Sequence, residues 1–187
     1  MVSPHSTLRH GWMTRARNLI AAALMTAVGC EIADFDVERS GTATIPSRPD
    51  AEAITVMELD GFEIVLAEIE DTENIGPEDI SGAELRRFTI EVLDPADAEL
   101  SFVDGIEIYA EAPDLERVRI AHLDEVPRGA QRIELEVDGV DLHDYIIAPV
   151  VTLSAVVDGD APETDVRVRA VAVLNIGATL RGACDHG

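Results

Sequence analysis

A two-residue alternation of apolar and polar side chains runs through most of this chain from residue 54 onward. A β-strand turns successive side chains to opposite faces, so the alternation predicts antiparallel strands with one buried and one solvated face. Two further stretches, 150–157 and 166–176, are apolar on both faces for much of their length. These two predict central strands, or strands with one side covered by another element. The alternating segments are 62–66, 88–92, 106–110, 117–120 and 133–137.

Turn signals separate these strands at short intervals. Asp-Gly occurs at 60–61, 104–105, 138–139 and 158–159, and this dipeptide favours turns that need positive φ. Residues 140–145 predict no more than one helical turn. The pattern therefore predicts an all-β fold, an antiparallel β-sandwich of about seven to eight strands, Ig-like or jelly-roll-like, with a small barrel as the alternative.

The N-terminal segment has a different chemistry. Arg9, Arg15 and Arg17 supply positive charge, and no acidic residue precedes Glu31. Residues 19–28 form an uninterrupted apolar run, but a membrane-spanning helix needs about 20 such residues. Residues 1–29 are therefore expected to be a signal peptide. The compact leader that begins at Met13 predicts that translation starts there.

The leader ends in Ala27-Val28-Gly29-Cys30, which resembles the lipobox of a bacterial lipoprotein precursor. The resemblance implies that Cys30 is lipidated and becomes the mature N-terminus. One position departs from the pattern, because Ala27 stands where Leu is usual. The alternative is an ordinary signal peptide cut nearby, with Cys30 incidental. Two or more acyl chains anchor a protein stably, whereas one chain holds only marginally.

The lipidation hypothesis divides the mature chain into two parts. Residues 30–50 are expected to be the lipidated cysteine and a tether, in which 42–45 could form a first edge strand before Pro46. Residues 51–187 are expected to be the β-sandwich domain. Within it, the stretches 100–127 and 133–157 resemble segments of uncharacterised bacterial envelope lipoproteins, over roughly residues 88–173. That resemblance implies a location in the cell envelope and an all-β fold, but no activity.

The mature part is strongly acidic. Residues 30–187 contain 11 arginines, 37 acidic residues and no lysine, a net charge of −26. A field of that size repels nucleic-acid phosphates and anionic lipid headgroups, so neither is expected as a partner. It favours cations and basic proteins.

The residues that usually carry catalysis are sparse in the mature part. His143 lies between Asp141 and Asp144, but zinc sites need three or four ligands at suitable spacing, so a surface-loop histidine is the better interpretation. His122 closes a strand, and His186 lies in the C-terminal tail. Cys184 has no third cysteine with which to form an intrachain disulfide and is expected to be a small buried thiol. No G-x-S-x-G elbow occurs, and a G-x-x-x-x-G-K loop is impossible without lysine.

The many acids leave two chemical alternatives open. A dispersed carboxylate pair could hydrolyse glycosides, which predicts a concave cleft where two or more acids converge. The only tryptophan, Trp12, is lost with the leader, and this argues against a sugar site. Calcium is the other alternative, because oxygen-rich loops suit Ca²⁺, although neither loop completes an EF-hand spacing. The candidate calcium ligands are Asp158, Asp160 and Glu163 in one loop, and Asp138, Asp141 and Asp144 in the other.

The sequence thus predicts a non-enzymatic, lipid-anchored domain of the cell envelope that acts in binding, assembly or structure. It predicts no catalytic residue, no cofactor and no confident metal ligand, and Cys30 is its one assigned site. The partners expected are the membrane, through the lipid, and an unidentified envelope protein. Because Glu31 follows the cysteine, the outer membrane is favoured over the inner. The alternative functions are a carboxylate-pair hydrolase and a calcium-dependent adhesion module.

Overall fold

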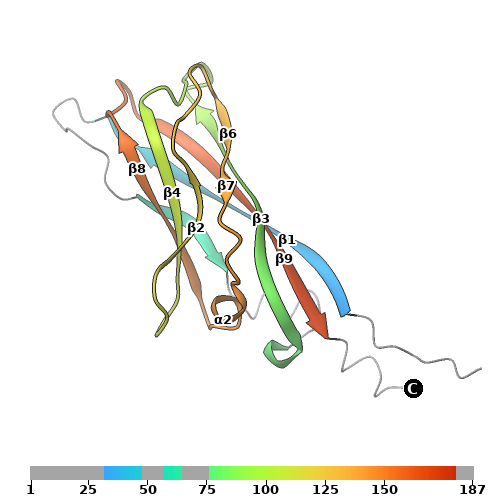
Figure 1. Cartoon of the computed structure of the whole chain (residues 1–187). Helices are drawn as coiled ribbons and strands as arrows, with labels where there is room; N and C mark the ends of the chain where they lie inside the picture. Colours follow the sequence, from blue (N-terminus) through green and yellow to red (C-terminus); the bar gives the residue numbers. More distant parts are fainter. Residues whose placement is uncertain (1–31, 48–56, 65–75, 180–187) are drawn as a thin grey trace, which may run out of the picture.

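The computed structural model describes residues 32–47, 57–64 and 76–179. These ranges form an all-β structure with two short helical turns (Figure 1). No helix in the described ranges is long and apolar enough to cross a membrane. The strands are β1 (Ile32–Ile45), β2 (Met57–Ile64), β3 (Ile80–Asp94), β4 (Val103–Glu111), β5 (Val118–Leu123), β6 (Arg132–Glu134), β7 (Glu136–Val137), β8 (Val151–Gly159) and β9 (Val166–Thr179); the turns are η1 (Pro77–Asp79) and α2 (His143–Ile146).

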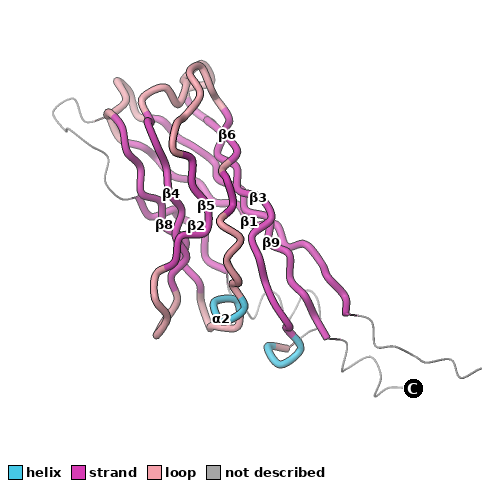
Figure 2. The backbone as a smooth tube through the Cα atoms, viewed as in Figure 1, coloured by secondary structure: helices cyan, strands magenta, loops and turns pink. Residues whose placement is uncertain are grey.

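The strands form two antiparallel sheets that pack face to face (Figure 2). We call β6-β3-β9-β1 sheet A and β2-β8-β4-β5-β7 sheet B; one residue pair, Thr42 with Asp60, links them. Strands β1 to β4 alternate between the two sheets, which is the connectivity of a double Greek-key jelly roll. In an Ig-like sandwich some consecutive strands, such as the first two, share a sheet. The predicted sandwich is confirmed, and its topology is that of a jelly roll.

The alternation seen in the sequence builds the core between the sheets. The side chains of Phe88, Ile108 and Ile176 are completely buried there. The pairing of β3 with β9 is irregular between Leu85 and Arg87, where two consecutive arginines are exposed. Because of this irregularity, apolar residues of β3 face the core both before and after it. The predicted central strands are confirmed, because β9 lies between β3 and β1, and β8 lies between β2 and β4.

The predicted tether at 30–50 is wrong between residues 32 and 41, whereas the strand expected at 42–45 is confirmed as the end of β1, although it lies between β9 and β2 rather than at an edge. Strand β1 pairs with β9 residue by residue from Ile32–Thr179 to Ile45–Val166. Its exposed acids occupy only the outward face, while Val37 faces inward and is buried. The sandwich therefore includes residue 32 rather than beginning at 51. Cys30 and the leader lie outside the described residues.

Two smaller predictions also change. The single strand expected at 133–137 is two short strands, because the chain crosses from sheet A (β6) to sheet B (β7) around Leu135, whose N–H donates to the Phe88 carbonyl at 2.9 Å. Of the four Asp-Gly pairs, those at 60–61 and 104–105 lie inside strands, and the pair at 158–159 ends β8. Gly139 and Gly159 have positive φ, at 65° and 144°. The predicted helical turn at 140–145 corresponds to α2.

Candidate functional site

A network of charged side chains covers the outer face of sheet B. Strand alternation, together with an irregularity in the β4–β5 pairing between Ile108 and Tyr109, turns these side chains away from the core. The register sets Glu107 opposite His122, and His122 opposite Glu136. Tyr109 lies opposite Arg119 in the same hairpin. We call this set the sheet B network; its members are Glu107, Tyr109, Glu111, Arg117, Arg119, His122, Glu136, Asp138 and Ser154.

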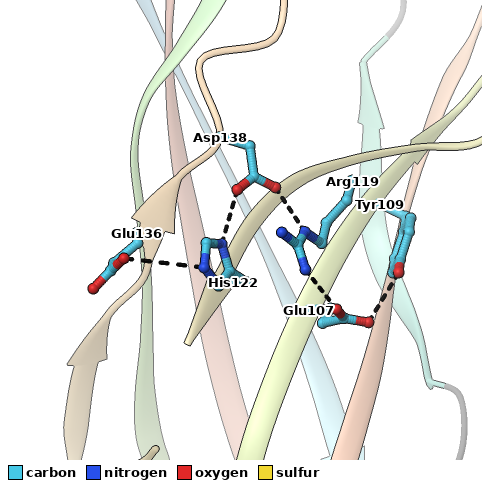
Figure 3. Close-up of polar contacts among 6 residues, drawn as sticks. All are labelled: Glu107, Tyr109, Arg119, His122, Glu136 and Asp138. Carbon is cyan, nitrogen blue, oxygen red and sulfur yellow. Dashed lines mark hydrogen bonds and ion pairs between the residues drawn. The ribbon is translucent and has the colours of Figure 1, made fainter. Parts of the chain in front are cut away.

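Arg119 is the centre of the network (Figure 3). Its Nη1 donates to Glu107 Oε1 at 2.7 Å, and its Nε donates to Asp138 Oδ2 at 2.8 Å. The Tyr109 hydroxyl donates to Glu107 Oε2 at 2.9 Å. Both carboxylate oxygens of Glu107 are therefore occupied by donors within the molecule.

His122 extends the network toward β7. Its Nδ1 lies 2.8 Å from Asp138 Oδ1, and its Nε2 lies 4.0 Å from Glu136 Oε2. The Nδ1 contact is short but lacks hydrogen-bond geometry, so it acts as an electrostatic contact. Asp138 thus divides its two oxygens between Arg119 and His122.

Arg117 extends the network in the other direction. Its guanidinium lies 3.9 Å from the centroid of the Tyr109 ring, within cation–π range. Its Nε pairs with Glu111 Oε1 at 2.9 Å, and its Nη2 donates to Ser154 Oγ at 3.1 Å. The Ser154 hydroxyl donates to the same Glu111 oxygen at 3.0 Å. The network therefore runs without a break across β7, β5, β4 and β8.

These contacts shift the pKa values of three groups in the network, Glu107, Tyr109 and Arg119. The hydrogen bond from Arg119, followed by that from Tyr109, lowers the pKa of Glu107. The hydrogen bond to the Glu107 carboxylate raises the pKa of Tyr109, and the bonds to Glu107 and Asp138 raise the pKa of Arg119. At neutral pH the carboxylate is charged and the phenol is neutral, so neither is suited to general acid–base exchange.

A shallow groove of about 380 Å³ lies on the outer face of sheet A, near its α2 end. Asn175 is fixed within it, because its amide donates to Asp36 Oδ1 at 3.0 Å and accepts from Arg86 at 3.2 Å. Arg86 also pairs with Glu84 at 2.8 Å. The groove is lined by Asp34, Ser81, Gly82, Ala83, Glu84, Arg86, Gly139, Val140, Asp141, Asn175 and Gly177.

The structure gives His143 a local structural role. Its Nε2 lies 3.2 Å from the Ile80 carbonyl, and its Nδ1 lies 3.0 Å from Asp144 Oδ1. The bond to Asp144 raises the pKa of His143. Its backbone N–H donates to Asp141 Oδ1 at 2.9 Å. The sequence predicted that His143 lies in a surface loop. Instead, His143 joins α2 to the start of β3.

The proposed calcium ligands do not gather in the described ranges. Asp138 turns toward Arg119 and His122, whereas Asp141 and Asp144 contact His143. Among the described residues, no three or more His, Cys, Asp or Glu side chains are grouped so that they could hold a metal ion. The candidates Cys30, Cys184 and His186 lie outside the described residues.

The role of His122 is not evident from its neighbours in sequence, because its contacts are to Glu136 on the next strand and to Asp138 just after that strand. Arg119 and His122 are three residues apart, so regular alternation would turn them to opposite faces of the sheet. The irregularity in the β4–β5 pairing, where Tyr109 faces Arg119 and Ile108 faces Ala121, brings both to the outer face. A continuous register would have set Glu107 opposite Ala121, so pairing the hairpin by sequence would not have revealed the network.

Comparisons with known proteins do not assign a family. No protein-family model matches the chain, and no curated protein matches it. Among solved structures, the decameric BFDV capsid protein is 8% identical, with a TM-score of 0.42, covering 79% of this chain and 99% of that one. The 60-mer BFDV capsid protein is 9% identical, with a TM-score of 0.39, covering 80% and 94%. Likeness at this level assigns no function.

Proposed function

We propose that the protein is a lipid-anchored, acidic domain of the cell envelope that binds a basic partner and has no catalytic role. The observation that carries the proposal is the unequal distribution of charge. Five arginines are held in ion pairs with carboxylates: Arg86, Arg117, Arg119, Arg132 and Arg169. On the outer face of β1, Asp34, Asp36 and Glu38 are exposed, and Asp36 accepts a hydrogen bond from the neutral Asn175 amide.

This distribution supports recognition of a positively charged surface. Glu107, Asp138 and Glu111 of the sheet B network are already compensated by Arg119 and Arg117. The exposed acids of β1 present a negative face to an external partner. Complementary charge of this kind accelerates association and selects against acidic partners.

The position of β1 defines how the anchor would hold the domain. Cys30 precedes Ile32, the first residue of β1, by two positions. Two residues of extended chain span at most about 7 Å. A lipid on Cys30 would therefore hold this end of the sandwich close to the membrane surface, and we favour the outer membrane.

Two measurements on the purified protein test the anchor. Mass spectrometry of the mature N-terminal peptide is expected to find Cys30 as the first residue, carrying acyl chains. The Cys30→Ser variant is expected to move from the membrane fraction to the soluble fraction. A mature N-terminus elsewhere, or an unmodified Cys30, would refute lipidation.

The binding role needs a separate test with a matched control. The full chain in non-ionic detergent is used to capture partners from an envelope extract, alongside an Asp34→Asn/Glu38→Gln variant. The control is Asp97→Asn/Glu99→Gln, which removes the same charge from exposed positions in the β3–β4 connection. Reduced capture by the first variant alone supports recognition through β1. Equal capture by both variants refutes it.

A second candidate, the carboxylate-pair hydrolase, is favoured by one observation: three acids, Asp34, Glu84 and Asp141, line the groove on sheet A. Two of them are engaged, because Glu84 pairs with Arg86 and Asp141 accepts the His143 N–H. Hydrolysis of a panel of chromogenic glycosides that Glu84→Gln or Asp141→Asn abolishes would establish this alternative over the binding role.

A further inference from the structure

The groove on sheet A has a floor made by two glycines that face each other on neighbouring strands. Gly82 of β3 lies opposite Gly177 of β9, and Gly177 lies opposite Asp34 of β1. These ends of β3, β9 and β1 lie side by side (Figure 1). Two adjacent residues without side chains leave the backbone of a sheet face uncovered, so a ligand can approach it closely. The groove of about 380 Å³ therefore has a backbone floor over β3 and β9, on the side of β1 away from β2.

Two side-chain oxygens reach toward this floor from the strands on either side of β9. A Cβ added to Gly177 would lie 2.9 Å from Ser81 Oγ of β3 and 3.3 Å from Asp34 Oδ1 of β1. The hydroxyl and the carboxylate therefore flank one point above β9. A group with several N–H donors seated over Gly177 would find both acceptors within hydrogen-bonding reach.

One wall of the groove is held in place by contacts within the molecule. The Asn175 amide donates to Asp36 Oδ1 at 3.0 Å and accepts from Arg86 Nη2 at 3.2 Å. The same Arg86 nitrogen pairs with Glu84 Oε1 at 2.8 Å. A wall that is ordered before binding reduces the entropy that is lost when a ligand binds.

The charge of the lining decides which class of ligand fits. Three carboxylates, Asp34, Glu84 and Asp141, and one guanidinium, Arg86, give the lining a net charge of −2 at neutral pH. Glu84 neutralises Arg86, so an anion would face the carboxylates of Asp34 and Asp141 and be repelled. Among the described residues, no three His, Cys, Asp or Glu side chains are grouped so as to hold a metal ion. The groove therefore fits an organic cation that carries several N–H donors.

We propose that the groove on sheet A receives an arginine or lysine side chain of the basic partner. The proposal rests on the proposed function and deepens it, because it names the seat of the partner's cation. The charged head would lie over Gly177, between Ser81 and Asp34, and its methylene stem would pack along Gly82 and Val140. The volume is at the lower end of the range for ligand pockets, which suits one long side chain.

The probe is the blocked peptide acetyl-Ala-Ala-Arg-Ala-Ala-amide, added to the isotope-labelled full chain in non-ionic detergent and followed by NMR. It is expected to shift the backbone amide signals of Gly82 and Gly177. A peptide with citrulline in place of arginine keeps the shape of the side chain and loses its charge. It is expected to bind at least about tenfold more weakly, because the charge-assisted hydrogen bonds are lost.

Two substitutions test the seat from the side of the protein. Gly82→Leu fills the groove, and the variant is expected to fold because nothing lies within 4 Å of the added Cβ. It should weaken binding of the arginine peptide by about tenfold or more. Its matched control, Val171→Leu, adds bulk on the outward face of β9 outside the groove and should bind as wild type. Thermal melts check the fold of both variants.

The second substitution, Asp34→Asn, keeps the shape of the side chain and removes the carboxylate that flanks Gly177. It should weaken binding by about tenfold, the loss of one charge-assisted hydrogen bond. Its matched control is Glu38→Gln, which removes the same charge from the same strand outside the groove and should change binding less than about twofold.

Four results would overturn the inference. They are equal binding of the arginine and citrulline peptides, equal weakening by Asp34→Asn and Glu38→Gln, the absence of shifts at Gly82 and Gly177, or shifts there with a peptide that carries glutamate instead of arginine. If Gly82→Leu leaves capture of the envelope partner unchanged while Asp34→Asn/Glu38→Gln reduces it, the groove inference is wrong and the proposed function stands. If neither variant reduces capture, both are wrong.

Discussion

The change Gly159→Ala tests how closely β4 and β8 approach at one end of sheet B. Gly159 has φ of 144°, and a Cβ at this position would lie 2.3 Å from the Phe102 carbonyl oxygen and 2.9 Å from both the Asp104 nitrogen and the Val103 Cα. All three are backbone atoms of the neighbouring segment, so no side chain can rotate away. The substitution must displace one strand relative to the other.

The expected cost follows from two contributions. A non-glycine residue in this backbone region costs about 1–3 kcal/mol. Displacing the Phe102 carbonyl also weakens the hydrogen bond that it accepts from the Asp160 N–H at 2.8 Å, a further ~1 kcal/mol. The free energy of unfolding should fall by about 2–4 kcal/mol, which lowers the melting temperature by roughly 10 °C in a chain of this size.

Thermal and urea unfolding followed by circular dichroism measure the effect, with two glycines as controls. Gly139 has φ of 65° but open space around its Cβ position, so Gly139→Ala should cost only about 1 kcal/mol. Gly82 has neither constraint, and Gly82→Ala should be neutral within ~0.5 kcal/mol or slightly stabilising. If Gly159→Ala proved as stable as Gly82→Ala, the close backbone approach deduced here would be wrong.

Four other predictions cover the core, the network, α2 and calcium. Phe88 is fully buried, so Phe88→Ala should lower the free energy of unfolding by about 3–5 kcal/mol in urea titrations. Glu107→Gln should bring the raised pKa of Tyr109 back toward 10.0, as measured by near-ultraviolet absorbance; no change would mean that their hydrogen bond is absent in solution. His143 has a pKa raised above 6.5, chiefly by Asp144, so its stabilising contribution is present below that pH and is lost as pH rises through the raised pKa. Asp144→Asn should therefore destabilise the protein more in mildly acidic than in alkaline buffer, and an equal effect at both would contradict this. If the acidic loops bind calcium, millimolar Ca²⁺ should raise the melting temperature beyond the effect of equal ionic strength; the absence of such a shift would dispose of the calcium alternative.

The local pattern of the chain was sufficient to predict most strands. Alternation at 106–110 and at 117–120 predicted β4 and β5, because burial of one face imposes a period of two on any strand at a sheet surface. The same rule did not predict the strand at 32–41. The inward face of this segment is only partly apolar, and its long-range pairing with β9 decides its structure. Pairing between distant segments leaves no local signal.

The candidate site shows the same division. The sequence determines that Glu107 and Arg119 are polar positions on strands, because each alternates with buried residues. It does not determine that His122 shares their face, because this depends on the irregularity in the β4–β5 pairing. It does not determine that Asp138 lies between Arg119 and His122, because that contact depends on the crossing of the chain from sheet A to sheet B at Leu135.

What the sequence by itself determined is therefore the all-β class, the acidic surface and the marked change of chemistry at Cys30, all of which depend on composition and local period. Only the tertiary structure decided that the sandwich is a jelly roll, that the acids from Asp34 to Glu38 belong to a strand, and that this strand pairs with β9. These features depend on which strands become neighbours. Which strands become neighbours is determined by the simultaneous burial of strand faces that are far apart in the chain. No local stretch of sequence carries this information.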